Sequence, residues 1–240
     1  MHARVPSAQP DSDDAGDPVV LVHGLGVSSR YMVPTLRELA SSSVRVFAPD
    51  LPGFGRSDKP GHILSLAELA DSLAEWMSAQ SVGRAVLLGN SLGCQVIAVF
   101  AHRHPARLSA AVLVGPTPDP AALSPWRQAL RLVRDAPHES PSEAVYAVAD
   151  YWRAGPRRMW RTLNEALQSP MSEQLAGMPV PTLIVRGGED PIVSQGWVEQ
   201  ATALLPRGRL VIIPGGPHAA NYSAAPVLVR EVRRFLAQDG

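Results

Sequence analysis

Residues 85–101 read Ala-Val-Leu-Leu-Gly-Asn-Ser-Leu-Gly-Cys-Gln-Val-Ile-Ala-Val-Phe-Ala, and this stretch decides the fold. A short apolar run, typical of a buried strand, leads directly into a longer run that is typical of a helix. Ser91 lies at the junction with a glycine two positions away on each side, which is the G-x-S-x-G pattern of a nucleophile elbow. A serine that projects from such a turn needs φ > 0, and side chains at the two flanking positions would collide with the strand and the helix. The pattern therefore predicts that Ser91 is a nucleophile.

On both sides of this stretch, short apolar runs alternate with helical patterns. The apolar runs are rich in β-branched residues, as expected for strands that are covered on both faces, and they span 19–22, 44–48, 85–88, 110–114, 182–185 and 210–213. Helical patterns lie near 33–40, 66–79, 92–104, 196–204 and 226–237. This alternation predicts an α/β fold with a mostly parallel sheet and helices on both of its faces.

Two segments depart from the alternation. Residues 1–17 are rich in Pro, Ser, Asp and Ala, so we expect a mobile leader followed by a single domain at 18–240. Between the strands that end at Val114 and begin at Thr182, amphipathic segments with several aromatic residues replace any clear strand pattern. The segment at about 117–178 is therefore predicted to be a small helical cap over the carboxyl end of the sheet.

Composition limits the classes of partner. The 240 residues are 45% hydrophobic, which is ample for the core of one large α/β domain. The formal net charge is +0 and the sequence pI is about 7.1, and the arginines are scattered along the chain, so neither a nucleic-acid nor a membrane partner is expected. No apolar run reaches the length of a membrane span, the N-terminus lacks the apolar core of a secretory signal, and Cys94 is the only cysteine. We therefore expect a cytoplasmic protein.

An elbow serine needs a base and an orienting acid. Asp190 and His218 each follow a predicted strand in the last third of the chain. Because the carboxyl ends of parallel strands meet at one edge of a sheet, both residues are expected at the same edge as Ser91. Glu189, adjacent to Asp190, and Asp119, after the preceding strand, stay open as alternative acids. The sequence shows no metal-ligand cluster and no complete dinucleotide-binding glycine pattern, so no metal and no cofactor are expected.

Four segments, in this order and spacing, resemble the α/β-hydrolase fold family from about Val19 to nearly the end of the chain. They are His-Gly-Leu-Gly at 23–26, Asp-Leu-Pro-Gly-Phe-Gly-Arg-Ser-Asp-Lys-Pro at 50–60, Gly-Asn-Ser-Leu-Gly at 89–93, and the loops of Asp190 and His218. In that family the chain order is serine, acid, histidine. The resemblance implies that His218 accepts the Ser91 proton and that Asp190 fixes the tautomer of the imidazole.

The resemblance also implies the groups that stabilise the oxyanion. Residues 23–25 would form the oxyanion loop, with the backbone N–H of Leu25 as one donor and the backbone N–H of Leu92 as the other. Leu92 follows the nucleophile at the start of a predicted helix, where amides point outward and the dipole favours an anion. His23 precedes the elbow in the chain, so we expect it to shape the loop rather than to act as the base.

The substrate is less tightly specified. Asn90 resembles the elbow of C–C bond hydrolases that act on ring-cleavage products, but Ala219 follows His218 where that group carries tryptophan. The aromatic-rich cap predicts an apolar pocket, whose walls are expected to include Tyr31, Met32, Trp126 and Trp152. We expect a carboxylesterase that cleaves a small ester through an acyl-enzyme intermediate. A C–C bond hydrolase and a slow or non-catalytic binding protein of the same fold are the alternatives.

One departure from the family concerns the N-terminus. Members usually carry two additional antiparallel strands before the strand that ends near His23, whereas only eighteen residues without a strand pattern precede it here. The run at 44–48 would then be an edge strand with unpaired backbone groups. We expect either that the leader covers this edge or that a second subunit pairs with it in a homodimer.

Overall fold

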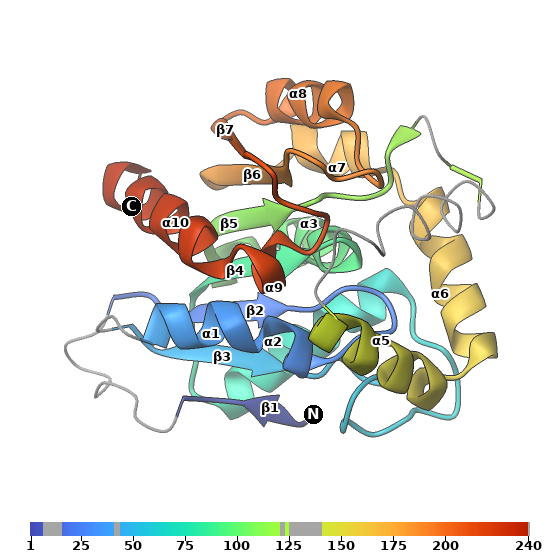
Figure 1. Ribbon diagram of the computed structural model, residues 1–240. Helices are drawn as coiled ribbons and strands as arrows, with labels where there is room; N and C mark the ends of the chain where they lie inside the picture. Colours follow the sequence, from blue (N-terminus) through green and yellow to red (C-terminus); the bar gives the residue numbers. More distant parts are fainter. Residues whose placement is uncertain (7–15, 41–43, 121–122, 125–140, 240) are drawn as a thin grey trace.

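The computed structural model describes residues 1–6, 16–40, 44–120, 123–124 and 141–239, and a seven-stranded sheet forms its centre (Figure 1). The strand order is β1-β3-β2-β4-β5-β6-β7, and every neighbouring pair from β3 to β7 is parallel. The strands are β1 (Ala3–Arg4), β2 (Val19–Val22), β3 (Val46–Pro49), β4 (Ala85–Asn90), β5 (Leu108–Val114), β6 (Thr182–Gly187) and β7 (Gly208–Ile213). The predicted α/β architecture with a mostly parallel sheet is confirmed.

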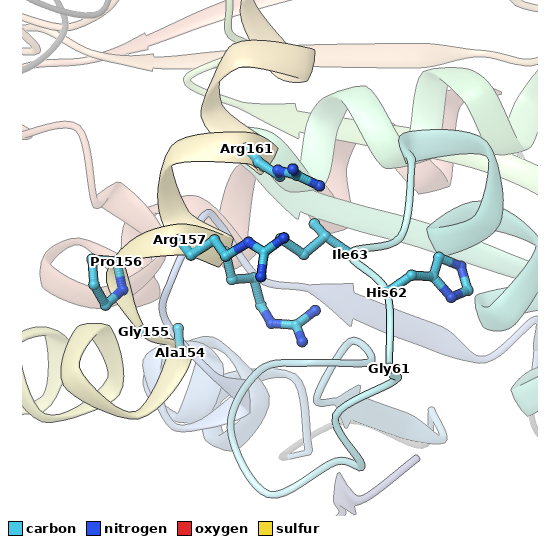
Figure 2. Close-up of a pocket in the computed structure, with 9 residues that line it drawn as sticks. Gly61, His62, Ile63, Ala154, Gly155, Pro156, Arg157 and Arg161 are labelled. Carbon is cyan, nitrogen blue, oxygen red and sulfur yellow. The ribbon is translucent and has the colours of Figure 1, made fainter.

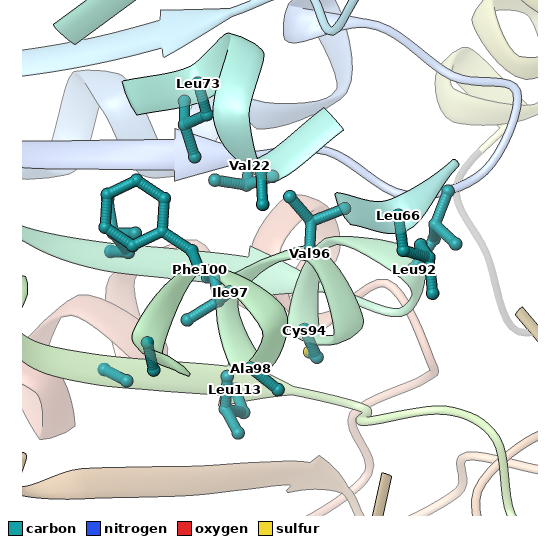
Figure 3. Close-up of a cluster of buried hydrophobic side chains, with 14 of the residues drawn as sticks. Val22, Leu66, Leu73, Leu92, Cys94, Val96, Ile97, Ala98, Phe100 and Leu113 are labelled. Atoms are coloured by element: carbon teal, nitrogen blue, oxygen red, sulfur yellow. The ribbon is translucent and has the colours of Figure 1, made fainter. Parts of the chain in front are cut away.

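Helices cover both faces of the sheet, because alternate strand residues point to opposite sides. Val20, Val22 and Leu87 belong to one buried cluster, whereas Val19, Leu21 and Val86 belong to the other. The first cluster is completed by α2 (Leu66–Ala79), α3 (Leu92–Arg103) and α8 (Gln195–Leu204), and the second by α1 (Val33–Ala40) and α10 (Ala225–Asp239). Figure 3 shows the side chains of α3 packed between Leu73 and Val22 on one side and Leu113 on the other.

Local signals place several boundaries well. The helix α2 begins where Ser65 and Glu68 form a reciprocal capping box, and it spans the predicted residues. The helix α1 also has its predicted bounds, while β3 and β5 are shifted or extended by two residues. The ends of these two strands are set by pairing with the neighbouring strands, which the apolar runs alone do not reveal.

The N-terminal segment is not wholly a mobile leader, so that prediction is wrong for residues 1–6. Ala3 and Arg4 pair antiparallel with Pro49 and Ala48 of β3. The carbonyl of His2 accepts a hydrogen bond from the backbone N–H of Asp50 at 2.8 Å. A two-residue strand has no periodic pattern that the sequence could reveal. Coverage of the β3 edge by the leader is confirmed, and the homodimer prediction loses the unpaired edge on which it depended; residues 7–15 lie outside the described residues.

The cap consists of helices at the carboxyl end of the strands (Figure 1). Its described elements are α5 (Pro141–Ala154) and α6 (Pro156–Gln168). The helix α7 (Met171–Ala176) also belongs to the predicted insertion but lies against the C-terminal end of α3, where Nε2 of His102 is 2.8 Å from the carbonyl oxygen of Gln174. Met171 and Leu175 of α7 join the buried cluster around α3, which fixes the C-terminal end of the insertion against the sheet. Among the described helices, none is long and apolar enough to cross a membrane.

Three short helical segments complete the described part of the fold. The 3-10 turns η1 (Ser29–Met32) and η2 (Pro105–Arg107) precede α1 and β5, and α9 (Ala220–Ser223) precedes α10. The amide of Asn221 in α9 donates to the carbonyl of Tyr31 in η1 at 3.2 Å. This contact joins the loop after β2 to the loop after β7 at the carboxyl edge of the sheet.

Candidate active site

Ser91 sits in a strained turn between β4 and α3. Its backbone has φ 53° and ψ −116°, and it is one of two non-glycine residues with positive φ among the described residues. Its N–H donates to the carbonyl of Val114 at 3.0 Å, and its carbonyl accepts from the N–H of Cys94 at 2.9 Å. The turn is therefore held from both sides, as expected for a residue whose conformation costs free energy.

The two glycines that flank Ser91 are required by close packing. A Cβ atom at Gly89 would lie 2.6 Å from the backbone carbonyl carbon of Gly93, and a Cβ atom at Gly93 would collide with the carbonyl oxygen of Val22. Cys94 is fully buried beneath the turn, with its Sγ 3.3 Å from the carbonyl oxygen of Gly89, and burial raises the pKa of its thiol. Figure 3 shows Cys94 on α3 among buried apolar side chains, where it acts as a small packing residue.

His218 and Asp190 form a buried hydrogen-bonded pair. The distance from Nδ1 of His218 to Oδ2 of Asp190 is 2.8 Å. The other carboxylate oxygen of Asp190 accepts hydrogen bonds from the backbone N–H groups of Ile192 at 2.7 Å and Val193 at 2.9 Å. A carboxylate at Nδ1 favours the tautomer that carries its proton there, which leaves Nε2 as the basic nitrogen.

The elbow and the His218 loop are tied together by Asn90. Its side-chain amide donates to the backbone carbonyl of His218 at 3.2 Å and to that of Val114 at 3.3 Å. Gly115 has φ +56°, and a Cβ atom there would lie 2.8 Å from Cε1 of His218 and 3.3 Å from Oδ2 of Asp190. The carboxyl ends of β4, β5, β6 and β7 therefore meet around Asn90, the residue directly before Ser91.

Of the three candidate acids, Asp190 is the one in contact with His218. Glu189 is exposed, and its backbone N–H donates to the carbonyl of Gly216. Asp119 is buried, but its Oδ2 accepts from the backbone N–H of Ser194 at 3.1 Å, at the start of α8. The order of residues in the chain could not show which of these three carboxylates contacts His218, because that contact depends on how each loop folds.

Arg186 supports the loop of Asp190, a role that no sequence pattern indicated. Its Nε donates to the carbonyl of Val193 at 2.7 Å, its Nη1 to that of Gly188 at 3.0 Å, and its Nη2 to that of Asp190 at 2.8 Å. The guanidinium thus satisfies three carbonyls of the turn that carries the carboxylate. An arginine directly before the Gly187-Gly188 turn was the only available signal, and it has no pattern by itself.

The loop after β2 lies beside Ser91. A Cβ atom at Gly24 would be 3.3 Å from Oδ1 of Asn90 and 3.5 Å from Cβ of Ser91. Leu92 is the first residue of α3, so its N–H has no acceptor within the helix. In the part of the chain that the structure describes, neither this N–H nor that of Leu25 has a hydrogen-bond acceptor. Both amides are therefore without a described acceptor, one directly after Ser91 and the other directly after Gly24.

His23 holds the oxyanion loop in place. Its Nδ1 is 2.8 Å from the carbonyl oxygen of Gly24, and its Nε2 accepts from the backbone N–H of Leu51 at 3.0 Å. This arrangement uses the neutral ring with the proton on Nδ1, and complete burial lowers the pKa of His23. The expectation that His23 shapes the loop is confirmed.

The loop at 50–60 is organised by Asp50, a role that the sequence did not reveal. Its carboxylate accepts from the backbone N–H of Ser29 at 2.6 Å and from that of Arg56 at 2.8 Å. Nδ1 of His2 lies 3.0 Å from Oδ2 of the same carboxylate. Burial works against ionisation, but the hydrogen bonds from Arg56 and Ser29 outweigh it and lower the pKa of Asp50.

The predicted pocket walls need correction. Trp152 is 83% exposed and does not line an enclosed pocket, and Met32 is fully buried in the core beside α1 and α10. Tyr31 is buried and stacks on Tyr222 with the ring centroids 6.1 Å apart, while Trp126 lies outside the described residues. Neighbouring residues on a helix point about 100° apart, so an aromatic pattern does not tell which side chain faces inward.

Two other cap residues lie over the oxyanion loop. Gly26 has φ +76°, and a Cβ atom there would be 2.6 Å from Cδ1 of Tyr151 and would collide with the Sδ of Met159. Tyr151 belongs to α5 and Met159 to α6. Gly26 is adjacent to Leu25, so these two cap side chains lie against the loop that follows β2.

Comparison with known proteins identifies a matching family and similar esterases. The Alpha/beta hydrolase family matches this sequence over residues 19–232. A pimeloyl-[acyl-carrier protein] methyl ester esterase from Edwardsiella ictaluri (strain 93-146) is 31% identical over 236 residues, covering 85% of this chain and 87% of that protein. An esterase from Rhodococcus sp. ECU1013 superimposes with a TM-score of 0.75 and 26% identity, covering 99% of this chain and 94% of that chain.

Part of this chain is also similar to part of a longer plant protein. Over 111 residues the chain is 35% identical to the Oryza sativa subsp. japonica protein named "Probable 1-acylglycerol-3-phosphate O-acyltransferase". The match covers 44% of this chain and 27% of the plant protein. This chain therefore spans well under two thirds of that relative.

Proposed function

This chain belongs to the alpha/beta hydrolase family, and we propose that it cleaves a small carboxylic ester with Ser91, His218 and Asp190 as its catalytic triad. The observation that carries the proposal is the buried contact of 2.8 Å between Nδ1 of His218 and Oδ2 of Asp190. Asn90, the residue directly before Ser91, donates a hydrogen bond to the backbone carbonyl of this histidine. A base with a fixed tautomer beside a strained serine is what nucleophilic acyl transfer requires.

In the first half of the reaction, Ser91 attacks the ester carbonyl. Nε2 of His218 takes the proton from Oγ of Ser91, and Asp190 stabilises the imidazolium that forms. The imidazolium then donates this proton to the oxygen of the departing alcohol, which leaves an acyl group on Oγ of Ser91. In the second half, Nε2 removes a proton from a water molecule, and the hydroxide that results attacks the acyl carbon. The imidazolium then returns the proton to Oγ of Ser91 as the bond between Oγ and the acyl carbon breaks, which releases the carboxylic acid and regenerates Ser91.

Both tetrahedral intermediates carry a negative oxygen. The N–H groups of Leu25 and Leu92 are the proposed donors, supported by the close approach of Gly24 to Ser91 and by the place of Leu92 at the start of α3. Amides that are held before the reaction stabilise the developing charge without reorganising. Loss of one such donor typically costs about 3 kcal/mol of transition-state stabilisation.

The hydrogen bonds of Asn90 favour an ester as the substrate over a ring-cleavage product. Its side-chain amide already donates to the carbonyls of His218 and Val114, so its presence in the elbow has a structural explanation. Tyr151 and Met159 over Gly26 supply apolar surface of the kind that binds an acyl chain. These two observations support a carboxylesterase rather than the alternative C–C bond hydrolase.

The experiment compares wild type with Ser91→Ala in two assays, labelling by a fluorophosphonate probe and hydrolysis of p-nitrophenyl butyrate. Wild type is expected to react in both, and Ser91→Ala is expected to lose labelling and about 10⁶-fold in kcat. Ser81→Ala is the matched control, because Ser81 also has positive φ (55°) but is exposed at the far end of α2. The proposal fails if Ser91→Ala retains the activity of wild type, or if wild type neither reacts with the probe nor hydrolyses the ester.

A further inference from the structure

A second pocket lies between the start of α6 and the loop at 61–63, outside the triad (Figure 2). Its volume is about 450 Å³, and its lining is Gly61, His62, Ile63, Ala154, Gly155, Pro156, Arg157, Arg158 and Arg161. In Figure 2, Arg157 and Arg161 project from α6 on the side of the loop that carries Ile63. The volume falls within the range of pockets that hold small molecules.

Among the described residues, no side chain neutralises the charge of the three arginines in this pocket. In the part of the chain that the structure describes, Arg157, Arg158 and Arg161 have no ion-pair partner and no hydrogen-bond acceptor. By contrast, Arg103 forms a two-pronged pair with Asp71, at 2.8 and 2.6 Å. Guanidinium groups that face a concave surface without a carboxylate are suited to an oxyanion.

Two carboxylates on the elements around this pocket, Glu68 and Glu165, already have partners. Glu68 lies 2.9 Å from Nε2 of His62 and also accepts from the backbone N–H and the hydroxyl of Ser65. The hydrogen bond from the backbone of Ser65, together with His62, lowers the pKa of Glu68 to about 2. Glu165 accepts from the backbone N–H of Leu66 at 2.7 Å. Each of these two carboxylates is thereby held by a partner other than the three arginines.

The start of α6 adds further positive potential. Gly155 at the N-cap provides no side-chain cap, Pro156 occupies the first turn, and no acidic residue is present there. The first-turn amides of this 13-residue helix and its dipole both favour negative charge at this end. The amides reinforce a site that the arginine side chains define.

The same turn of α6 also contacts the active-site loops. The guanidinium of Arg158 lies against Gly53 of the loop at 50–60, since a Cβ atom at Gly53 would collide with it. The next residue, Met159, lies against Gly26 beside the proposed oxyanion donor Leu25. Lys59 Nζ donates to the carbonyl of Arg153, which ties the 50–60 loop to the end of α5. The first turn of α6 therefore lines the arginine pocket with Arg158 and contacts the loop beside residues 23–25 with Met159.

We propose that this pocket binds a carboxylate or phosphate group carried by the ester substrate, so that the enzyme prefers anionic esters. The inference rests on the proposed function, because it assigns an anionic class of substrate to that same active site. The charge would be bound by Arg157, Arg158 and Arg161, while Tyr151 and Met159 contact the apolar part of the substrate near Gly26.

The test measures kcat/KM for matched pairs of esters that differ by one anionic group. One pair places the charge on the acid side, with p-nitrophenyl monoesters of dicarboxylic acids against p-nitrophenyl esters of monocarboxylic acids of equal length. The other pair places the charge on the alcohol side, with short-chain acylglycerol phosphates against the same acylglycerols. The variants are Arg157→Gln, Arg161→Gln and the double variant, and the control is Arg37→Gln on α1, an exposed arginine with no described partner.

Wild type is expected to prefer the anionic member of at least one pair. Each arginine substitution should lower the anionic-to-neutral ratio about tenfold, the usual effect of one charge-assisted hydrogen bond. The control Arg37→Gln should keep the wild-type ratio. Lack of preference in wild type for every pair, or a ratio unchanged in the double variant, would overturn the proposal.

Calorimetric titration with inorganic phosphate separates a substrate group from a free anion. If phosphate binds to wild type and binds less tightly to the double variant while the ester ratio is unchanged, the pocket holds a free anion and substrate recognition is ruled out. Absence of both fluorophosphonate labelling and ester hydrolysis in wild type is a failure of the proposed function instead. The two failures are therefore distinguishable.

Discussion

The carboxyl edge of β4 to β7 and the start of α6 use their polar groups in opposite ways. At the sheet edge, Asp190 accepts three described hydrogen bonds, and Asn90 and Arg186 donate to backbone carbonyls of the same loops. At the start of α6, Arg157 and Arg161 have no acceptor within the described residues. Full internal pairing fixes the position of a reacting group, whereas unpaired charge around a concave surface is suited to a ligand from outside.

This difference assigns the two regions separate tasks. Chemistry needs groups that are placed before the substrate arrives, since reorganisation during the reaction would raise the barrier. Recognition of an anion needs donors that are unoccupied until it binds. Substitutions at the sheet edge should therefore change kcat, and substitutions in the cap should change which substrates are used.

Apart from loss of Ser91 itself, the largest effect is expected from Asp190→Asn. An amide at this position can no longer hold the imidazole tautomer with its proton on Nδ1, so kcat should fall by about 10⁴-fold. The matched control is Asp119→Asn, a buried carboxylate on the neighbouring loop that contacts Ser194. Steady-state kinetics of the two variants checks the assignment, and an equal loss in both would contradict the view that Asp190 alone orients His218.

A smaller effect is expected from Arg186→Gln. Three buried carbonyls lose their donor, which should lower the free energy of unfolding by about 3 kcal/mol and displace the loop of Asp190. Arg107→Gln is the control, because Arg107 also donates to three backbone carbonyls but lies away from the site.

The measurement for this pair combines thermal unfolding with kcat. Both variants should be less stable, and Arg186→Gln alone should have a lower kcat with KM little changed. Arg186→Lys should restore part of the rate, since one donor returns. If both arginine variants lower kcat equally, the effect is one of general stability, and Arg186 has no positioning role.

The smallest expected effect is a difference in KM between variants of two neighbouring aromatic residues of the cap. Tyr151→Ala should raise KM for p-nitrophenyl esters several-fold, because it removes apolar surface over Gly26, whereas Trp152→Ala should leave KM unchanged because its side chain is 83% exposed. A KM series over increasing acyl length measures the difference. If Trp152→Ala has the larger effect, the assignment of the pocket wall is wrong.

Much of the sheet edge could be predicted from the sequence because its signals are local. The requirement for glycine at 89 and 93 arises from the backbone around Ser91 itself, and the structure bears out both clashes. Buried parallel strands produce continuous apolar runs, so their positions were also evident. The choice of Asp190 over Asp119 needed the tertiary structure, since both follow strands of the same sheet.

The cap and the N-terminus were harder to predict. On α5, the sequence could not tell that Tyr151 faces the oxyanion loop while Trp152 faces solvent, because both fit an amphipathic pattern. The pairing of Ala3 and Arg4 with β3 depends on a partner more than forty residues away and has no local pattern. Contacts of this kind arise only when distant segments fold together.

The sequence by itself determined the α/β fold, the strained nucleophile turn at Ser91 and the chain order of serine, acid and histidine, because each depends on sterics or on short-range periodicity. Only the tertiary structure decided which carboxylate meets His218, which guanidinium supports its loop, and which arginines surround an open pocket beside the oxyanion loop. The physical reason is that hydrogen bonds and unpaired charges between loops depend on positions in space that no single segment encodes.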